Sequence, residues 1–452
     1  MKRWLIVWLT TLLPALSASE LTLVVEIEEE VARCAPANNG AGPLWCYGAP
    51  LVVRQGSDVF VSALETGVGV PPLSNTRPRL YRKRGDGAWD LLHASSSFRH
   101  REPCPLVGLA DGAVFLSLNP SLEPPGNHYG RCDPHLAVFA KPDAHAEPTI
   151  LRPPWPKDAT FTDHSYRGAA TDRSTGELLV LNIDAATSAQ HYALRDAKGQ
   201  WARAGKIRFP LRACYPQVAL RDGAAHVLAI SDIVEPHDAW RVYKHAKTKQ
   251  GWDYVFRRLF YAAARDLRQK DFSEPVEVES VDATAGHIGN QDLWIGPDGA
   301  AHILFRRQNV QSALLRDRFF PGTPLATSLV WVVLKDGKEV RRETLLDSVE
   351  GREGPLLGNS RFHAMDSQRL FVVFGVSGVE GGKPVHENRV LQLLPERGAP
   401  QRIPLQEPFS LSFTACERGG SAPSATLDLF GVGGNGERLR YARVRLGFGK
   451  KS

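Results

Sequence analysis

Methionine and long apolar runs are both scarce in this sequence of 452 residues, in which Met365 is the only methionine after the initiator. Beyond the first 18 residues no segment is apolar over the ~20 residues that a membrane-spanning helix needs. The formal charge is only +6 and 43% of the residues are hydrophobic, which excludes a disordered chain. No low-complexity stretch or linker marks a second domain. The sequence therefore predicts one large domain over residues 19–452.

Closely spaced cysteine pairs are also missing. The chain has six cysteines without CxxC or zinc-finger spacing, namely Cys34, Cys46, Cys104, Cys132, Cys214 and Cys416. A thiolate metal site is therefore not expected, and the sequence predicts neither a metal nor a cofactor. Exported proteins form disulfides, and we expect one between Cys104 and Cys132, which should lie near the same face of one repeat.

The first 18 residues are typical of a signal peptide. Lys2 and Arg3 precede an apolar run from Trp4 to Leu16, and small residues follow at Ser17 and Ala18. This pattern predicts export, cleavage near residues 17–18 and a secreted or periplasmic protein that has no membrane contact after cleavage.

Glycine and proline are abundant, at 40 and 32 residues. Many of them lie at the turns of a recurring unit, in which an apolar strand is followed by a turn and then by a more strongly apolar strand. Copies include CPLVGLADGAVFLSLN from Cys104, YPQVALRDGAAHVLAIS from Tyr215 and NQDLWIGPDGAAHILFR from Asn290. The Asp-Gly pair at the turn favours a tight hairpin. Two further strands follow each hairpin, so each unit predicts a four-stranded antiparallel sheet.

Seven such units predict an all-β, seven-bladed β-propeller. A pair of β-sandwiches is the alternative, but it does not need the same unit so many times. The last unit lacks a fourth strand, and the segment from Leu21 to Ile27 is a spare one. We therefore expect the N-terminal strand to pair beside Arg438–Leu446 and to close the ring.

Two turns and three unit openings carry a resemblance to a known family. Asp86-Gly87-Ala88-Trp89 and Asp196 to Trp201 are similar to Asp-box turns. Asp163-His164, Cys214-Tyr215-Pro216 and the stretch from Gly286 open successive units. Together they resemble the BNR-repeat, sialidase-like propellers that include ulvan lyases, which cleave acidic polysaccharides by β-elimination. The resemblance implies that this protein is a polysaccharide lyase that acts by β-elimination, with His164 and Tyr215 as its catalytic residues.

The same family carries a second histidine and an arginine at positions that hold Asp184 and Ser231 here. This departure keeps two alternatives open. One is a propeller that binds glycans or another protein without catalysis. The other is a sialidase-like glycoside hydrolase, which uses a tyrosine, a glutamate and three arginines; no glutamate has an evident place beside Tyr215. His164, Tyr215 and His287 also have purely structural interpretations.

Cations and aromatic rings are expected around the catalytic pair. The innermost strand of each blade begins at one face of a propeller, and the loop between its second and third strands opens on that face. The planar guanidinium group of arginine binds carboxylate or sulfate through paired hydrogen bonds, and aromatic rings stack on sugars. The predicted substrate-binding residues are Tyr166, Arg167, Arg212, Trp240, Arg241, His287, Asn290, Arg306 and Arg307. Their composition predicts an acidic polysaccharide or oligosaccharide as the partner, and export argues against nucleic acid. The sequence does not indicate an oligomeric state.

Overall fold

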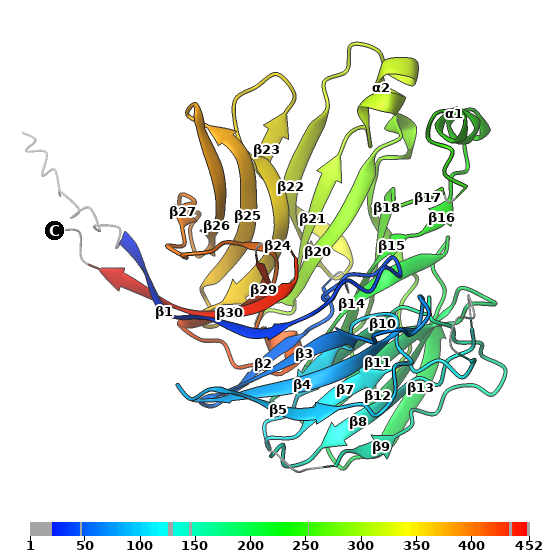
Figure 1. Ribbon diagram of the computed structural model, residues 1–452, viewed down its shortest axis with the longest axis vertical. Coiled ribbons are helices and arrows are strands. Elements are labelled where there is room, and N and C mark those ends of the chain that lie inside the picture. Colours follow the sequence, from blue (N-terminus) through cyan, green and yellow to red (C-terminus); the bar gives the residue numbers. More distant parts are fainter. Residues whose placement is uncertain are drawn as a thin grey trace, which may run out of the picture.

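Seven four-stranded antiparallel sheets form a β-propeller in this computed structural model (Figure 1). The structure describes residues 20–45, 48–124, 130–143, 147–251, 253–433 and 436–449. The predicted signal peptide lies outside these residues. No helix in the described ranges is long and apolar enough to cross a membrane.

Each of the first four blades follows the order of the chain from its innermost strand outward. The first blade contains β2 (Val52–Gln55), β3 (Asp58–Thr66), β4 (Thr76–Arg84) and β5 (Trp89–Ala94). The second contains β6 (Leu106–Gly108), β7 (Val114–Leu118), β8 (His135–Phe139) and β9 (Thr149–Leu151). The third contains β10 (Arg167–Asp172), β11 (Glu177–Ile183), β12 (Gln190–Arg195) and β13 (Trp201–Ile207). The fourth contains β14 (Ala213–Arg221), β15 (Ala224–Ser231), β18 (Arg258–Ala264) and β19 (Val276–Ser280).

The remaining blades follow the same plan, and the last one borrows the N-terminal strand. The fifth contains β20 (His287–Ile295), β21 (Ala301–Gln308), β22 (Ala326–Lys335) and β23 (Lys338–Val349). The sixth contains β24 (Leu356–Ala364), β25 (Leu370–Glu380), β26 (Lys383–Leu394) and β27 (Gln401–Arg402). The seventh contains β28 (Phe409–Thr414), β29 (Thr426–Gly433), β30 (Arg438–Gly449) and β1 (Glu20–Arg33). The fold also contains a short strand pair, β16 (Ile233–Val234) and β17 (Tyr254–Val255), and the 3-10 turns η1 (Asp282–Thr284) and η2 (Glu417–Gly419).

The predicted closure of the ring is confirmed. β1 pairs antiparallel with β30, with Leu21 opposite Phe448, Leu23 opposite Leu446 and Ile27 opposite Arg443. The first and last strands therefore lie side by side, blue against red in Figure 1. This pairing gives the seventh blade its fourth strand, so β30 is paired on both sides.

The predicted hairpin turns are present for the expected physical reason. Asp222 and Gly223, between β14 and β15, have φ angles of 52° and 79°. Positive φ at both central positions defines the type I′ turn, whose twist matches that of the paired strands. The Asp-box-like turns fall between third and fourth strands, because Trp89 begins β5 and Trp201 begins β13.

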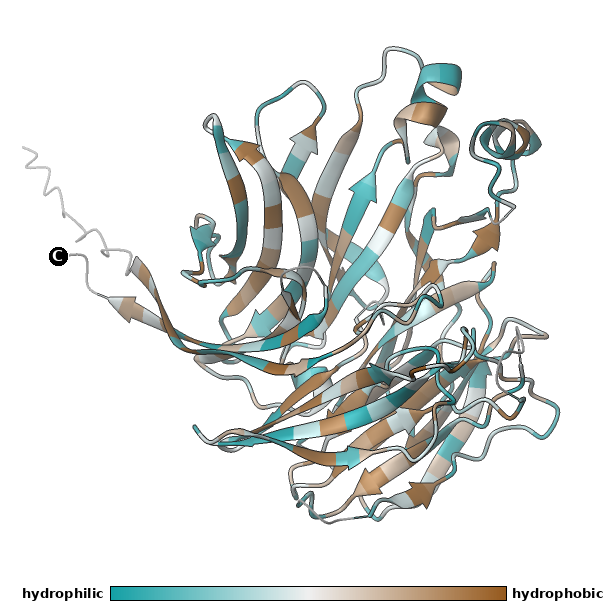
Figure 2. Ribbon diagram, in the orientation of Figure 1, coloured by the Kyte–Doolittle hydropathy of each residue, from teal (hydrophilic) through white to brown (hydrophobic). Residues whose placement is uncertain are grey.

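The hydrophobic core lies between neighbouring blades. Leu228 and Phe305 belong to one apolar cluster between the fourth and fifth blades, and Leu304 and Phe374 belong to another between the fifth and sixth. Brown apolar and teal polar segments alternate along many strands in Figure 2. Because the inner strands are held from both sides, their ends form rigid rims at the two faces of the ring. We call the face at which the inner strands begin, near Arg167, Ala213 and His287, the upper face, and the other the lower face.

Two helices stand on the upper face, in insertions between the second and third strands of their blades. α1 (Asp238–Thr248) follows β16, and α2 (Ala313–Phe319) follows β21. They lie next to one another in Figure 1. Trp240 of α1 packs against Phe319 of α2, with ring centroids 6.3 Å apart. Both insertions rise from the upper face, because each follows the second strand of its blade.

The predicted Cys104–Cys132 disulfide is wrong, because both thiols are free in the structure. Cys104 belongs to the apolar cluster between the first two blades, and its Sγ lies 3.8 Å from a guanidinium nitrogen of Arg167. The Cys132 thiol instead lies 3.8 Å from the carbonyl oxygen of Gly130. Cys34, Cys214 and Cys416 are free as well, and Cys46 lies outside the described residues.

Candidate functional site

Two stacked tyrosines form the centre of the upper face. The rings of Tyr166 and Tyr215 lie 4.0 Å apart at 30°, and a side-chain hydrogen bond joins them. They are 6% and 4% exposed. Burial raises the pKa of both phenols well above the usual value.

A local irregularity of β14 places Tyr215 in this pair. Its φ is 52°, at a bulge between Cys214 and Gln217. Bulges re-aim side chains and are frequent at functional sites. The amide of Asn290 on β20 donates to the Tyr215 carbonyl at 2.9 Å. Asn290 is therefore a residue that holds the backbone of Tyr215.

A buried acid lies beside the tyrosines. Glu102 from the lead of the second blade is 9% exposed and accepts a 2.6 Å hydrogen bond from Arg101. Burial raises the pKa of Glu102 to about 8, because loss of hydration outweighs the favourable charge of Arg101. The carboxylates of Asp163 and Asp232 raise this pKa further. Glu102 is thus a carboxyl that holds a proton near neutral pH.

Two more arginines surround the pair, and both have partners within the chain. Arg212 donates to the carbonyl oxygen of Asp232 at 3.0 Å and also to its carboxylate, and its guanidinium lies 5.9 Å from the Tyr166 ring. Arg167 donates to the carbonyl of Pro103 at 2.8 Å. Together with Arg101, they place three guanidinium groups around Glu102 and the tyrosines.

His164 lies at the same face and is paired with its sequence neighbour. Its Nδ1 lies 2.6 Å from a carboxylate oxygen of Asp163, and its side chain is 24% exposed. Asp163 links it electrostatically to Glu102, whose pKa Asp163 raises. A carboxylate on Nδ1 fixes the imidazole orientation and leaves Nε2 for chemistry.

The space between these groups is small. Glu102, Tyr166, Arg167 and Tyr215 line a cavity of about 10 Å³, which is room for about one water molecule. Trp45 packs edge-on against both tyrosines at 6.0 and 5.4 Å, and the guanidinium of Arg101 lies 5.4 Å from its ring. An indole therefore covers the tyrosine pair.

The other predicted binding residues are spread along the fifth blade and the helices. His287 begins β20, where burial lowers its pKa to about 4. Arg306 donates to the carbonyl of Leu357 at 3.0 Å, and Arg307 lies 3.6 Å from the carboxylate of Glu279. Trp240 holds the guanidinium of Arg257 over its ring at 4.9 Å, whereas Arg241 is exposed.

Sequence reasoning missed the contact of Glu102 with the tyrosines. In the sequence, no glutamate has an evident place beside Tyr215. The packing of the second, third and fourth blades brings residue 102 to residues 166 and 215, so the local sequence gives no direct signal. Asp232, which follows the second strand of the fourth blade, was missed for the same reason.

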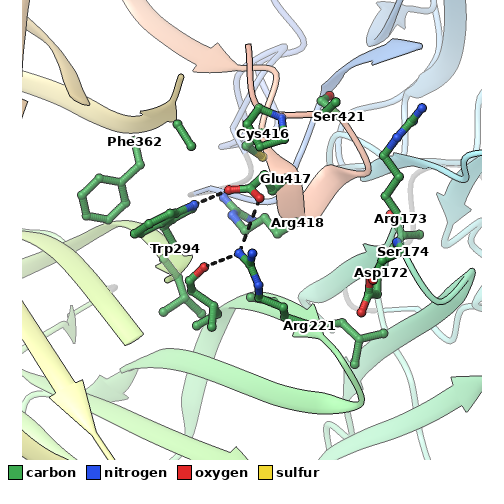
Figure 3. Close-up of a pocket in the computed structure, with 18 of the residues that line it drawn as sticks. Asp172, Arg173, Ser174, Arg221, Trp294, Phe362, Cys416, Glu417, Arg418 and Ser421 are labelled. Atoms are coloured by element: carbon green, nitrogen blue, oxygen red, sulfur yellow. Dashed lines mark hydrogen bonds and ion pairs between the residues drawn. The ribbon is translucent and has the colours of Figure 1, made fainter. Parts of the chain in front are cut away.

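A second, larger cavity opens on the lower face (Figure 3). It has a volume of about 540 Å³ and is lined by the ends of inner strands from the third to the seventh blade and by the η2 turn. Glu417, Arg221 and Trp294 lie on one side of it, and Arg173 and Ser174 on the other. Within the described residues, no cluster of three or more His, Cys, Asp or Glu residues could hold a metal ion.

Comparisons with known proteins found distant similarity to solved structures. No family model and no curated protein matches the chain. An α-L-arabinanase from Penicillium chrysogenum, solved with arabinobiose, is 10% identical with a TM-score of 0.41, and the match covers 93% of this chain and 98% of that one. A prolyl endopeptidase is 11% identical with a TM-score of 0.44, over 84% of this chain and 44% of that one. A sialidase from Trypanosoma rangeli, solved with sialic acid, is 14% identical with a TM-score of 0.39, over 82% of this chain and 58% of that one. The chain is thus similar to two carbohydrate-active enzymes and a peptidase, but the sequence identities and TM-scores are too low to indicate a substrate or a mechanism. Membership of the BNR-repeat family stays a prediction.

Proposed function

We propose that the protein is a secreted or periplasmic carbohydrate-active enzyme that hydrolyses glycosidic bonds at the upper face. The supporting observation is the buried Glu102, with a pKa of about 8, beside the Tyr166–Tyr215 pair. Hydrolysis of a glycoside needs an acid that protonates the leaving oxygen near neutral pH. A carboxyl whose pKa is raised by burial meets that need.

Asp232 is the second carboxyl group of the proposed reaction. A glycosidase also needs a carboxylate that activates water or attacks the sugar. The guanidinium of Arg212 binds Asp232 and holds its carboxyl group in place. Asp232 is the proposed partner of Glu102 in this reaction, because both carboxyl groups lie at the tyrosine pair and each has an arginine partner.

An acidic glycan is the proposed substrate. Arg101, Arg167 and Arg212 bring three guanidinium groups to one small site. Guanidinium groups bind carboxylate and sulfate through paired hydrogen bonds. The sugar would take the place that Trp45 occupies against the tyrosines, with the phenol rings as its stacking surface.

β-Elimination is the second candidate, and the His164–Asp163 pair favours it. A lyase needs a base for the proton beside the uronic carboxylate, and the 2.6 Å contact with Asp163 orients His164 for such a role. Tyr215 is a poor base, because burial raises its pKa well above 10. In this alternative Tyr215 would donate the proton to the leaving oxygen.

One assay separates these functions. The protein is incubated with a panel of neutral, uronic and sulfated polysaccharides, and both new reducing ends and the absorbance of a conjugated double bond are followed. Hydrolysis predicts reducing ends without the double bond, and elimination predicts both. Binding of a glycan without either product would contradict catalysis and favour a binding propeller.

A further inference from the structure

The lower-face cavity is separate from the tyrosine cluster, because the η2 turn crosses the axis of the ring. Gly420, just after η2, has a φ of 93°, and a Cβ there would lie 1.9 Å from the carbonyl oxygen of Gly108 in the second blade and 2.7 Å from Thr171 Oγ1 in the third. Arg418 pairs with Asp292 of the fifth blade at 2.7 Å and donates to the carbonyl of Gly48. The turn is thus wedged among the inner strands and forms the floor of the cavity.

One wall of the cavity holds a fixed carboxyl group. The Trp294 indole N–H donates to one oxygen of Glu417, and an Arg221 nitrogen lies 3.5 Å from the other (Figure 3). Arg221 itself donates to the carbonyl of Ile295 at 2.9 Å. The Glu417 side chain stays 24% exposed to the cavity. Such a carboxyl can hydrogen bond to a ligand hydroxyl.

The opposite wall carries a cation. Arg173 donates to the carbonyl of Gly420 at 3.3 Å and forms no ion pair with any residue that the structure describes. That bond uses one of the five donors of a guanidinium. Beside it lie the exposed Ser174 and the carboxylate of Asp222, with 3.5 Å between the Ser174 Oγ and an Asp222 oxygen. The wall thus offers a cation, a hydroxyl and a hydrogen-bond acceptor together.

We propose that this cavity binds a sugar acid, a ligand that carries both a carboxylate and several hydroxyls. The carboxylate would pair with Arg173, and the hydroxyls would bond to Glu417, Asp222 and Ser174. A volume of about 540 Å³ lies within the roughly 300–1,000 Å³ of small-molecule sites and accommodates one or two sugar rings. A neutral sugar leaves Arg173 without an anionic partner, and a simple carboxylate leaves the acceptors without donors.

Saturation-transfer NMR with galacturonate, and with galactose as its neutral counterpart, tests this site. We expect galacturonate to bind and galactose to bind at least about tenfold more weakly, because the charged hydrogen bonds to Arg173 are lost. Arg173→Ala should weaken galacturonate binding by a similar factor. Arg265→Ala is the matched control, since Arg265 is an exposed arginine whose partner is Asp336.

A second variant guards against an effect of charge alone. Ala422 is an exposed residue of the cavity lining, and Ala422→Trp should block the cavity and weaken galacturonate binding as Arg173→Ala does, without changing the charge. The proposal does not depend on the upper face, so Glu102→Gln should bind galacturonate as the wild type does. Equal signals for the two sugars, or full binding in Arg173→Ala or Ala422→Trp, would overturn it.

Discussion

The phenol ring of Tyr215 stacks on that of Tyr166 with centroids 4.0 Å apart, although the two residues begin neighbouring blades 49 positions apart in the sequence. Trp45 seals the pair edge-on, and the carboxyl of Glu102 completes the small cavity beside it. Burial therefore dominates the protonation of this site. The arginines nearby do not bring either phenol down to the range of a base, because the loss of hydration raises both pKa values.

The tyrosines should resist ionisation in alkaline solution. Since the pKa of each is raised well above 10 by burial, we expect neither phenol to ionise before the protein unfolds. Ultraviolet difference titration measures this directly. Tyr166→Phe and Tyr215→Phe should leave the number of tyrosines that titrate in the folded protein unchanged. A decrease by one in either variant would show that its phenol is accessible.

Glu102 should make the fold less stable at high pH. Its folded pKa of about 8 lies above the value of 4.5 for a free side chain, so the native state binds this proton more tightly than the unfolded state. The free energy of unfolding should fall as the pH rises between these values. Glu102→Gln removes the titration and should gain stability relative to the wild type at about pH 9 but not at about pH 4. Denaturant unfolding at both pH values checks this, and Glu277→Gln on the outer β19 strand is the control.

The Arg418–Asp292 pair should be a major contributor to stability. Both partners are buried, and loss of one leaves the other charge unpaired. We expect Arg418→Met to lower the free energy of unfolding by about 3–5 kcal/mol. The double variant with Asp292→Leu should recover much of that loss, because an apolar pair carries no uncompensated charge. A single variant as stable as the wild type would contradict this role.

The basic residues of α1 should differ in their contributions. Arg241 is exposed, whereas Lys244 is 15% exposed and lies 3.0 Å from Glu235 and beside Asp253. Arg241→Ala should weaken the binding of a sulfated polysaccharide at low salt without changing stability. Lys244→Ala should instead lower stability by about 1–3 kcal/mol. Affinity measured at two ionic strengths and thermal unfolding separate the two effects; equal behaviour of the two variants would be inconsistent with this assignment.

The repeated hairpins made the architecture predictable, because the signals are local. Asp222-Gly223 encodes its own turn, and the spare strand at Leu21–Ile27 matches the missing strand of the last blade. The helices were less accessible to prediction. Trp240 and Tyr243 lie three residues apart, as on one face of a helix, but they pack against Phe319 of another insertion. That contact depends on how two blades lie next to one another.

The site was only partly predictable for a related reason. Tyr166, Arg167, Arg212 and Tyr215 do gather at the upper face, since inner strands begin there. What the sequence did not reveal is that Glu102 lies against the tyrosines and that burial raises its pKa. The lower-face cavity also depends on long-range packing, because Glu417 reaches Trp294 and Arg221 only through the η2 turn that crosses the ring.

The pH dependence of glycoside cleavage by the wild type and by Glu102→Gln tests the central claim most directly. If Glu102 donates the proton, the rate should be high while its carboxyl is protonated and should fall as the pH rises through about 8. Glu102→Gln should be slower by about 10²–10⁴-fold, and its rate should no longer fall as the pH rises through about 8. Glu277→Gln should keep the wild-type rate and the wild-type fall at alkaline pH. A Glu102→Gln enzyme with the wild-type rate and the same alkaline limb would contradict the account.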